Sequence, residues 1–263
     1  MVILTYILAI LVGITMGLFG GGGSILTIPI LIYVANVEPI QATSYSIVIV
    51  GLSAIFGSAN KFRKNEIDLS KGIYFGIPSI IMLYLTRRYI IDLIPNTLAS
   101  VGEFALTKQN FILLIFTLIM LLSAYTMFFD TRIEHIQKEK HPLYIVALGV
   151  LIGLIVGLVG AGGGFLFIPA LVKFTGMKMK EAIGSSLFIV ALNSIFGFMG
   201  DIANDVRYDI SFLTIFAVIS IIGMFFGIYI SNYFSGRILK RYFAILVFLI
   251  AVSMILKEVF FIK

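Results

Sequence analysis

Two glycine-rich segments contain the residues of this sequence that could bind a ligand. The first, GLFGGGGSILTIP, runs from Gly17 to Pro29, and the second, GLVGAGGGFLFIP, runs from Gly157 to Pro169. Consecutive glycines form a poor helix interior, because each costs about 1 kcal/mol relative to alanine. We therefore expect a broken helix in each segment. The unpaired N–H groups that begin the next helix would then attract an anion without any Lys or Arg.

The helix that follows each segment carries hydroxyl and amide side chains that could assist. Ser46 with Ser53, and Ser186 with Asn193, are spaced seven residues apart and so share one helix face. The predicted substrate-binding residues are Gly20, Gly21, Gly22, Gly23, Ser24, Ser44, Ser46, Gly162, Gly163, Gly164, Ser185, Ser186 and Asn193. Two alternatives stay open: the glycines only permit close helix packing, and the polar side chains only bond neighbouring helices.

The composition excludes most other chemistry. The 263 residues are 60% hydrophobic and 12% charged, whereas a soluble domain has about 25% charged residues. The chain has no Cys, and its two histidines, His135 and His141, share one polar loop. Neither glycine segment continues as a P-loop or as a dinucleotide fingerprint. We predict an integral membrane protein of the helical kind with no enzyme activity, no cofactor and no metal site.

Helices that cross a membrane must position these residues. Several apolar runs are about 20 residues long, enough to span roughly 30 Å of hydrocarbon. The runs are 2–19, 24–35, 42–60, 72–86, 110–129, 142–159, 164–172, 182–200, 210–234 and 242–256, and 92–109 is among the polar loops. Charged residues at the ends of runs, such as Arg87, Arg88 and Asp201, are interpreted as interfacial anchors.

An internal repeat organises the chain. Residues 13–57 align without a gap on residues 153–197, and eighteen of the forty-five pairs are identical, glycines and prolines among them. The halves are residues 1–140 and 141–263, which together form one membrane domain. Glycines four residues apart before each segment, such as Gly13 with Gly17 and Gly153 with Gly157, are assigned to helix packing. We predict an all-α membrane protein of about eight transmembrane helices in two repeats, each opening with a glycine-broken helix or re-entrant hairpin.

The positive charges predict that the two halves are inverted. If each glycine segment forms a hairpin, the loops 61–71, 130–141, 173–180 and 235–241 share one face and carry 13 of the 19 Lys and Arg residues. If each segment crosses the membrane once, the split is 10 against 9. The positive-inside rule favours the uneven arrangement, with the basic loops cytoplasmic and both termini outside. Arg87 and Arg88 then lie on the outer face, against the rule.

The paired glycine–proline segments, together with the length and repeat spacing, resemble the TauE/SafE sulfite-exporter family. The resemblance implies a secondary-type transporter of the cytoplasmic membrane that exports small anions such as sulfite, organosulfonates or related organic anions. The partners it implies are the anion and the lipid bilayer, with a homodimer left open and no nucleic acid. An anion channel and a membrane assembly subunit that transports nothing are the alternative functions.

Overall fold

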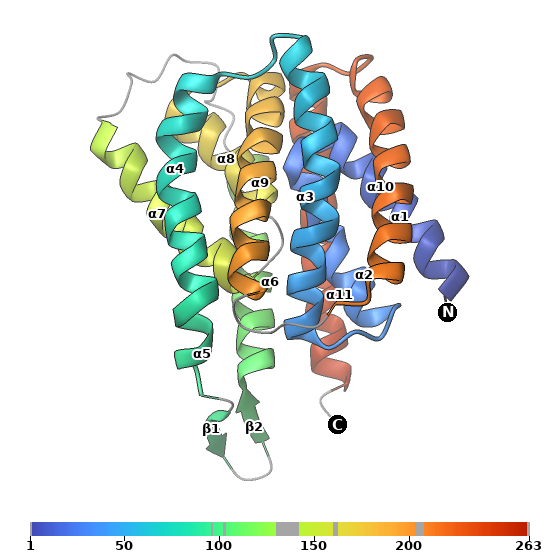
Figure 1. Ribbon diagram of the computed structural model, residues 1–263, viewed down its shortest axis with the longest axis vertical. Coiled ribbons are helices and arrows are strands. Elements are labelled where there is room, and N and C mark those ends of the chain that lie inside the picture. The colour runs from blue at the N-terminus through green and yellow to red at the C-terminus, as the bar shows by residue number, and fades with distance from the viewer. Residues whose placement is uncertain are drawn as a thin grey trace.

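The computed structural model describes residues 2–95, 97–101, 104–129, 142–159, 163–202 and 208–261. Within these ranges the chain forms a bundle of helices with one short hairpin (Figure 1). The elements are α1 (Val2–Phe19), the 3-10 helix η1 (Gly20–Leu26), α2 (Thr27–Tyr33), α3 (Pro39–Arg63), α4 (Leu69–Leu85), the π-helical turn η2 (Thr86–Ile90), α5 (Ile91–Leu93), β1 (Thr97–Val101), β2 (Phe104–Thr107), α6 (Lys108–Phe129), α7 (Pro142–Val159), α8 (Gly164–Thr175), α9 (Met179–Ile202), α10 (Ile210–Ser231) and α11 (Gly236–Phe261).

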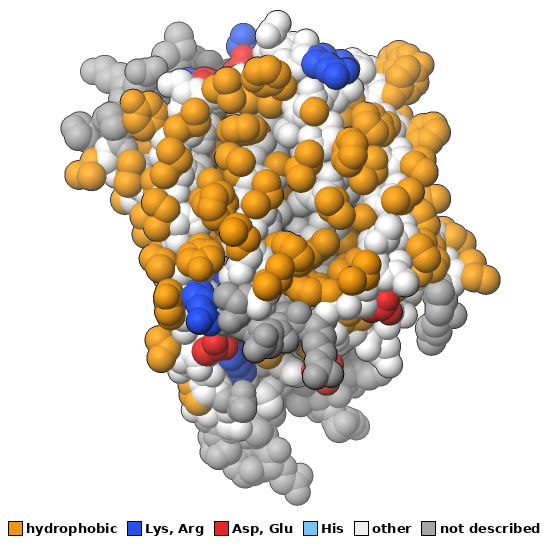
Figure 2. Space-filling view, in the orientation of Figure 1, with side chains coloured by type: hydrophobic (Ala, Val, Ile, Leu, Met, Phe, Trp, Pro, Cys, Tyr) orange, Lys and Arg blue, Asp and Glu red, His pale blue; other side chains and the backbone are white. Residues whose placement is uncertain are grey.

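The helices have the length and surface of a membrane protein. Seven helical stretches of the described residues are long and apolar enough to cross a bilayer, and α7 and α8 are shorter apolar helices. Figure 2 shows exposed hydrophobic side chains over a broad band, with charged side chains at the upper and lower margins of that face. The prediction of a helical membrane protein is confirmed. The described residues contain seven candidate spans and two shorter apolar helices, and the first of these spans, Ile3–Tyr33, includes η1; the division into two repeats stays a prediction.

One element departs from the predicted all-α fold. Strands β1 and β2 pair antiparallel, with Thr97 opposite Thr107 and Val101 opposite Phe104. This stretch lies in the polar loop 92–109, outside the candidate spans. Outside the hydrocarbon region a backbone is not confined to helix, and β-branched and aromatic residues favour strand there.

The chain turns back at both glycine segments. Gly20 has a left-handed φ of 61°, and the Thr15 hydroxyl donates to the carbonyl oxygen of Gly23 at 3.2 Å. In a continuous helix these two residues would be about 12 Å apart along the axis, so η1 returns along α1. In the second half Gly163, with a φ of 73°, precedes α8. The rings of Tyr144 and Phe174, at the start of α7 and near the end of α8, are then 5.8 Å apart.

The upstream glycines bring each outer helix against a helix of the bundle. A Cβ on Gly13 or Gly17 of α1 would overlap the backbone of α10, and a Cβ on Gly153 of α7 would overlap the backbone of α4 at Ser79. Because these helices touch through their backbones, only glycine fits at the contacts. The assignment of these glycines to helix packing is confirmed.

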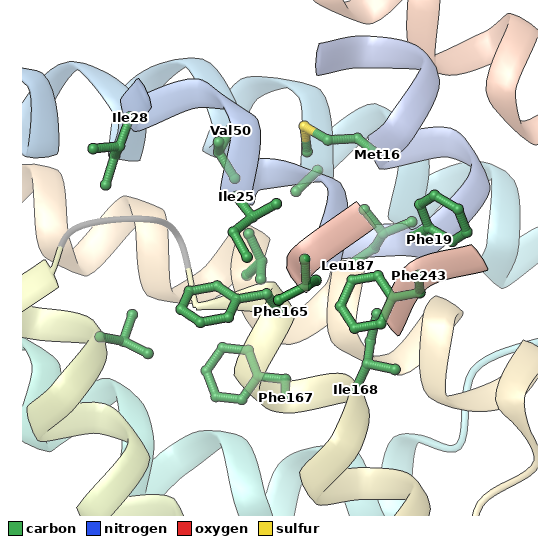
Figure 3. Packing of buried hydrophobic residues seen from close by; sticks show 14 of the residues in the cluster. Met16, Phe19, Ile25, Ile28, Val50, Phe165, Phe167, Ile168, Leu187 and Phe243 are labelled. Atoms are coloured by element: carbon green, nitrogen blue, oxygen red, sulfur yellow. The ribbon is translucent and has the colours of Figure 1, made fainter. Parts of the chain in front are cut away.

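Helices α3 and α9 lie side by side in the middle of the bundle and run in opposite directions (Figure 1). They touch closely where Gly51 faces Ser194. We call the end with the start of α3 and the ends of α4 and α9 the lower end, as it lies in Figure 1, and the opposite end the upper end. The hydrophobic core surrounds the two glycine turns, and Figure 3 shows the Phe19 ring beside the Phe243 ring, with centroids 5.6 Å apart.

Candidate functional site

The two glycine segments touch each other in the core. Gly164, the first residue of α8, lies against Gly21 of η1 so closely that a Cβ on Gly164 would overlap the Gly21 backbone. A Cβ on Gly21 would in turn be 2.8 Å from the Cα of Gly164. Side chains at either position would push the two halves of the chain apart. The central contact between residues 143 positions apart in the sequence therefore requires glycine on both sides.

The other glycines of the first segment are also enclosed by protein. A Cβ on Gly20 would be 2.6 Å from the carbonyl oxygen of Ile183 and 2.9 Å from the Ser186 hydroxyl. One on Gly22 would meet the Phe243 ring at 2.5 Å. These contacts account for the glycines by packing, and anion binding at them stays a prediction. Gly162 lies outside the described residues.

The predicted polar residues are all buried but do not form one cluster. Asn193 of α9 donates from Nδ2 to the Ser79 hydroxyl of α4 at 3.2 Å. Ser44 lies near the lower end and Ser185 near the upper end, where each bonds a different partner. Ser46, which is fully buried on α3, has a hydroxyl oxygen with no hydrogen-bond partner among the described residues. Ser186, by contrast, donates to the Ile183 carbonyl oxygen within its own helix and lies beside Gly20.

A buried ion pair that the sequence analysis missed links η2 to α9 at the lower end. Arg87 Nη1 lies 3.3 Å from Asp201 Oδ1, and the two side chains are 1% and 4% exposed. The same nitrogen donates to the hydroxyls of Thr43 at 3.2 Å and Ser44 at 3.4 Å. The interpretation of Arg87 and Asp201 as interfacial anchors is therefore wrong. Burial at the ends of α4 and α9 depends on the helices packed around them, which hydropathy along the chain does not describe.

The local structure directs the Arg87 side chain into the bundle. The residue lies in the π-helical turn η2, where the wider turn shifts the helix face presented to the bundle. Gly200 on α9 leaves room for it, because a Cβ there would be 3.0 Å from the Arg87 Cβ. Arg88, the next residue, lies instead with its guanidinium carbon 5.7 Å from the centre of the Tyr89 ring. The Arg87 side chain is thus buried in the bundle, whereas the Arg88 side chain is partly exposed.

Tyr208 completes the lower network. Its hydroxyl donates to Asp201 Oδ2 at 3.1 Å, and its ring stacks on Tyr45, with centroids 5.8 Å apart. The Tyr45 hydroxyl accepts from the backbone N–H of Asp209 at 2.9 Å. Burial, helped by the adjacent Asp201 carboxylate, raises the pKa of Tyr208. The phenol therefore keeps its proton and acts as a donor toward Asp201.

A smaller polar network lies at the upper end. Lys61, near the end of α3, is buried and pairs with Glu66, which is 25% exposed. The Ser185 hydroxyl accepts from the backbone N–H of Asp68 at 3.0 Å. Tyr45 and Ser185 are equivalent in the internal alignment, and Lys61 and Asp201 become equivalent when the alignment is extended by four residues past its end. That alignment was the signal that could have drawn attention to Asp201, because it places two opposite charges at one repeat position.

The described side chains form no cluster of three His, Cys, Asp or Glu that could hold a metal ion. Two apolar grooves lie on the outside of the bundle. One, of about 590 Å³, lies between α4 and α9 and is lined by residues such as Ile77, Ile81 and Phe196. The other, of about 340 Å³, lies between α1 and α10. Such surfaces suit lipid chains and not a charged solute.

Comparison with known proteins agrees with this architecture. The family model described as "Sulfite exporter TauE/SafE" matches residues 5–254, nearly the whole chain. The chain belongs to the TauE/SafE family. Membership makes it a multi-pass membrane transporter and not an enzyme, as the sequence analysis predicted.

Several relatives in this family match over most of their length. A probable membrane transporter protein of Xylella fastidiosa (strain 9a5c) is 30% identical over 254 residues, which cover 93% of this chain and 91% of the relative. The probable membrane transporter protein YjnA of Bacillus subtilis is 27% identical, with coverage of 89% and 92%. One of Haemophilus influenzae is 25% identical, with coverage of 97% and 98%. No solved structure matches the chain.

Proposed function

We propose that this TauE/SafE protein is a secondary transporter that exports small anions, such as sulfite, organosulfonates or related organic anions, across the cytoplasmic membrane. The observation that carries the proposal is the contact between Gly21 and Gly164. Helix α8 begins at this contact, so the positive end of its dipole lies in the buried core. Transporters commonly place such broken helices where they bind their substrates.

We propose further that residues 1–140 and 141–263 are inverted repeats. The first chain reversal opens toward the lower end and the second toward the upper end (Figure 1). Asp68 and Asp209 cap α4 and α10 in the same way, each accepting from a backbone N–H three residues on. In both halves the N–H of this Asp donates to the equivalent hydroxyl, that of Ser185 or Tyr45.

The orientation in the membrane follows from the charges. The loops 61–71, 173–180 and 235–241 lie at the upper end, whereas the start of α1 and the end of α11 lie toward the lower end (Figure 1). These loops carry ten Lys and Arg residues. By the positive-inside rule the upper end is cytoplasmic and the lower end faces outward. The partners are then the small anion and the bilayer.

Alternating access is the mechanism that this arrangement supports. Polar contacts close both ends: the Arg87–Asp201 pair links the two halves at the lower end, and the Asp68–Ser185 bond links them at the upper end. A carrier opens one end at a time around a central site. An anion channel would conduct with both ends open together, which is the behaviour that the planar-bilayer measurement below tests.

Ser46 offers the sharpest test of substrate binding by a side chain. Its buried hydroxyl has no partner in the described structure, whereas Ser53 on the same helix donates to the Ile49 carbonyl oxygen at 3.0 Å. Buried hydroxyls usually bond something, and a substrate oxygen is the partner we assign to Ser46. Its removal should therefore weaken substrate binding, and removal of Ser53 should not.

The experiment measures sulfite flux into liposomes that contain the purified protein. We expect saturable uptake that methanesulfonate inhibits, a KM raised roughly tenfold by Ser46→Ala, which corresponds to about 1.4 kcal/mol, and an unchanged KM for Ser53→Ala. Uptake no faster than into empty liposomes would refute anion transport. Single-channel currents in a planar bilayer would show a channel instead of a carrier.

A further inference from the structure

The Asp201 carboxylate lies among donors that would suit a free anion. Its Oδ1 is 3.3 Å from Arg87 Nη1, and its Oδ2 is 3.1 Å from the Tyr208 hydroxyl. The two donors come from elements far apart in the sequence, the turn η2 and the segment before α10. Each oxygen of one carboxylate thus has its own donor. A sulfonate, sulfite or carboxylate ion has two or more oxygens on one atom and could make the same two bonds.

The same place contains hydroxyls from the start of α3. Thr43 and Ser44 both accept from Arg87 Nη1, and both are buried. Ser44 lies two residues before Ser46, which is a rise of about 3 Å along the helix axis. The donors around Asp201 therefore lie about half a helical turn from Ser46 along α3, and they face another side of that helix, because residues two positions apart are about 200° apart around the axis.

The charged and titratable groups that face this place come from several elements. Asp201 faces Arg87 of η2 and Tyr208, and Tyr208 stacks on Tyr45 of α3. The Asp209 carboxylate is engaged as the cap of α10, where it accepts from the Phe212 N–H. A buried guanidinium at a membrane span is costly and is retained for pairing or for function. Here the pair links η2 to α9 at the lower end.

We propose that Arg87 and Tyr208, with Thr43 and Ser44, form an anion-binding site in which the Asp201 carboxylate takes the place of the substrate while the lower end is closed. The inference rests on the proposed transport function and adds a second anion-binding site to it. A small oxyanion that reaches Arg87 displaces Asp201 and so removes the link between η2 and α9. The lower end then opens, and when the anion leaves, Asp201 returns and closes it.

Binding of methanesulfonate to the purified full-length protein tests the site. Asp201→Asn removes the competing charge and leaves Arg87 in place, so we expect methanesulfonate to bind about tenfold more tightly than to the wild type. Adding Arg87→Gln to that variant should abolish the gain, and adding Tyr208→Phe should reduce it severalfold. Asp92→Asn, which removes an exposed carboxylate from the neighbouring α5, is the matched control and should bind like the wild type.

Three results would overturn the inference: equal affinity in Asp201→Asn and the wild type, no methanesulfonate binding by Asp201→Asn, or a gain that survives the loss of Arg87. If Asp201→Asn does not fold, Arg87→Lys replaces it. That variant keeps the charge but loses the forked donor geometry, so it should bind methanesulfonate at least tenfold more weakly, and unchanged affinity would refute the site.

Sulfite flux measured on the same preparations separates this inference from the proposed function. Sulfite uptake by the wild type without a gain in affinity in Asp201→Asn would refute the anion site and leave transport standing. A gain in affinity without sulfite or methanesulfonate uptake by the wild type would establish the anion site and refute transport of these anions.

Discussion

The lower and upper ends of the molecule each have a buried basic side chain paired with an acid, but the two pairs join different parts of the chain. At the lower end Arg87 and Asp201 are 114 residues apart in sequence, and both are almost fully buried. At the upper end Lys61 pairs with Glu66, five residues away, and Glu66 is partly exposed. Breaking the lower pair would separate two helices from different halves, whereas breaking the upper pair would loosen one local turn. The inverted halves that we propose therefore carry unequal ion pairs at their two ends.

The comparison between the two ends requires that they lie on opposite sides of the membrane, and this is the first point to test. Glu38 and Lys178 are equivalent in the internal alignment, exposed, and located at the lower and upper ends. The native chain has no cysteine. In intact cells we expect an impermeant thiol reagent to label Glu38→Cys fully and Lys178→Cys only after lysis. Matching labelling at both positions would mean that the halves are parallel.

Removing the basic partner should have the next largest effect, and mainly at the lower end. Arg87→Met leaves the Asp201 carboxylate buried without its cation, which we expect to lower the free energy of unfolding by about 3–5 kcal/mol. Lys61→Met should lower it by about 1 kcal/mol, because water can reach Glu66. Thermal and denaturant unfolding in detergent measures both.

A double variant checks that the charge, and not the packing, is responsible. Arg87→Met together with Asp201→Asn removes the unpaired carboxylate, so most of the lost stability should return. Equal losses of stability in Arg87→Met and Lys61→Met would remove the difference between the two ends.

The central contact between Gly21 and Gly164 is shared by both ends, and its disruption should have the third-largest effect on stability. Gly164→Ala forces a methyl group into the Gly21 backbone, and overpacking of this kind costs about 1–3 kcal/mol. Gly72→Ala on α4 is the control, since its Cβ would be 3.9 Å from the Phe188 ring. We expect the control to gain about 0.5–1 kcal/mol from helix propensity. Thermal unfolding that shows no loss for Gly164→Ala would contradict the close contact.

The smallest effects should be equal at the two ends. Tyr45→Phe and Ser185→Ala each remove the hydroxyl that accepts from the N–H of the Asp that caps the next helix. Each should lower the free energy of unfolding by about 1 kcal/mol, the usual net value of one hydrogen bond. Unfolding measured side by side gives the difference. A much larger loss for Tyr45→Phe would show that the Tyr208 stack also depends on the Tyr45 hydroxyl.

Local patterns in the sequence were enough to predict the helices. The apolar runs 2–19 and 142–159 coincide with α1 and α7, and the run 164–172 lies within α8. A bilayer requires long apolar segments whose backbone groups form hydrogen bonds within the same segment. Hydropathy and helix formation are therefore both local properties of the sequence. The glycine segments likewise predicted a break in the chain, because the cost of glycine in a helix is a property of the residue itself.

The candidate site was only partly predictable, because local patterns do not record contacts between distant segments. The sequence indicated that Ser44, Ser46, Ser185 and Ser186 lie on helices and, through the predicted inversion, that Ser44 and Ser185 belong to opposite ends, but not which partners they bond there. It also indicated an anion site built from backbone N–H groups, and so directed attention away from Arg87. A charge next to an apolar run is equally compatible with a place at the interface and with a place in the bundle.

By itself the sequence determined which segments enter the membrane, where two of them break and, through the internal alignment, which positions of the two halves correspond. Only the tertiary structure decided that Gly164 touches Gly21 and that Arg87 pairs with Asp201. Partition into lipid and helix formation depend on a residue and its near neighbours along the chain. Contacts between distant segments depend on how whole helices pack, and no local pattern records which side chains that packing brings together.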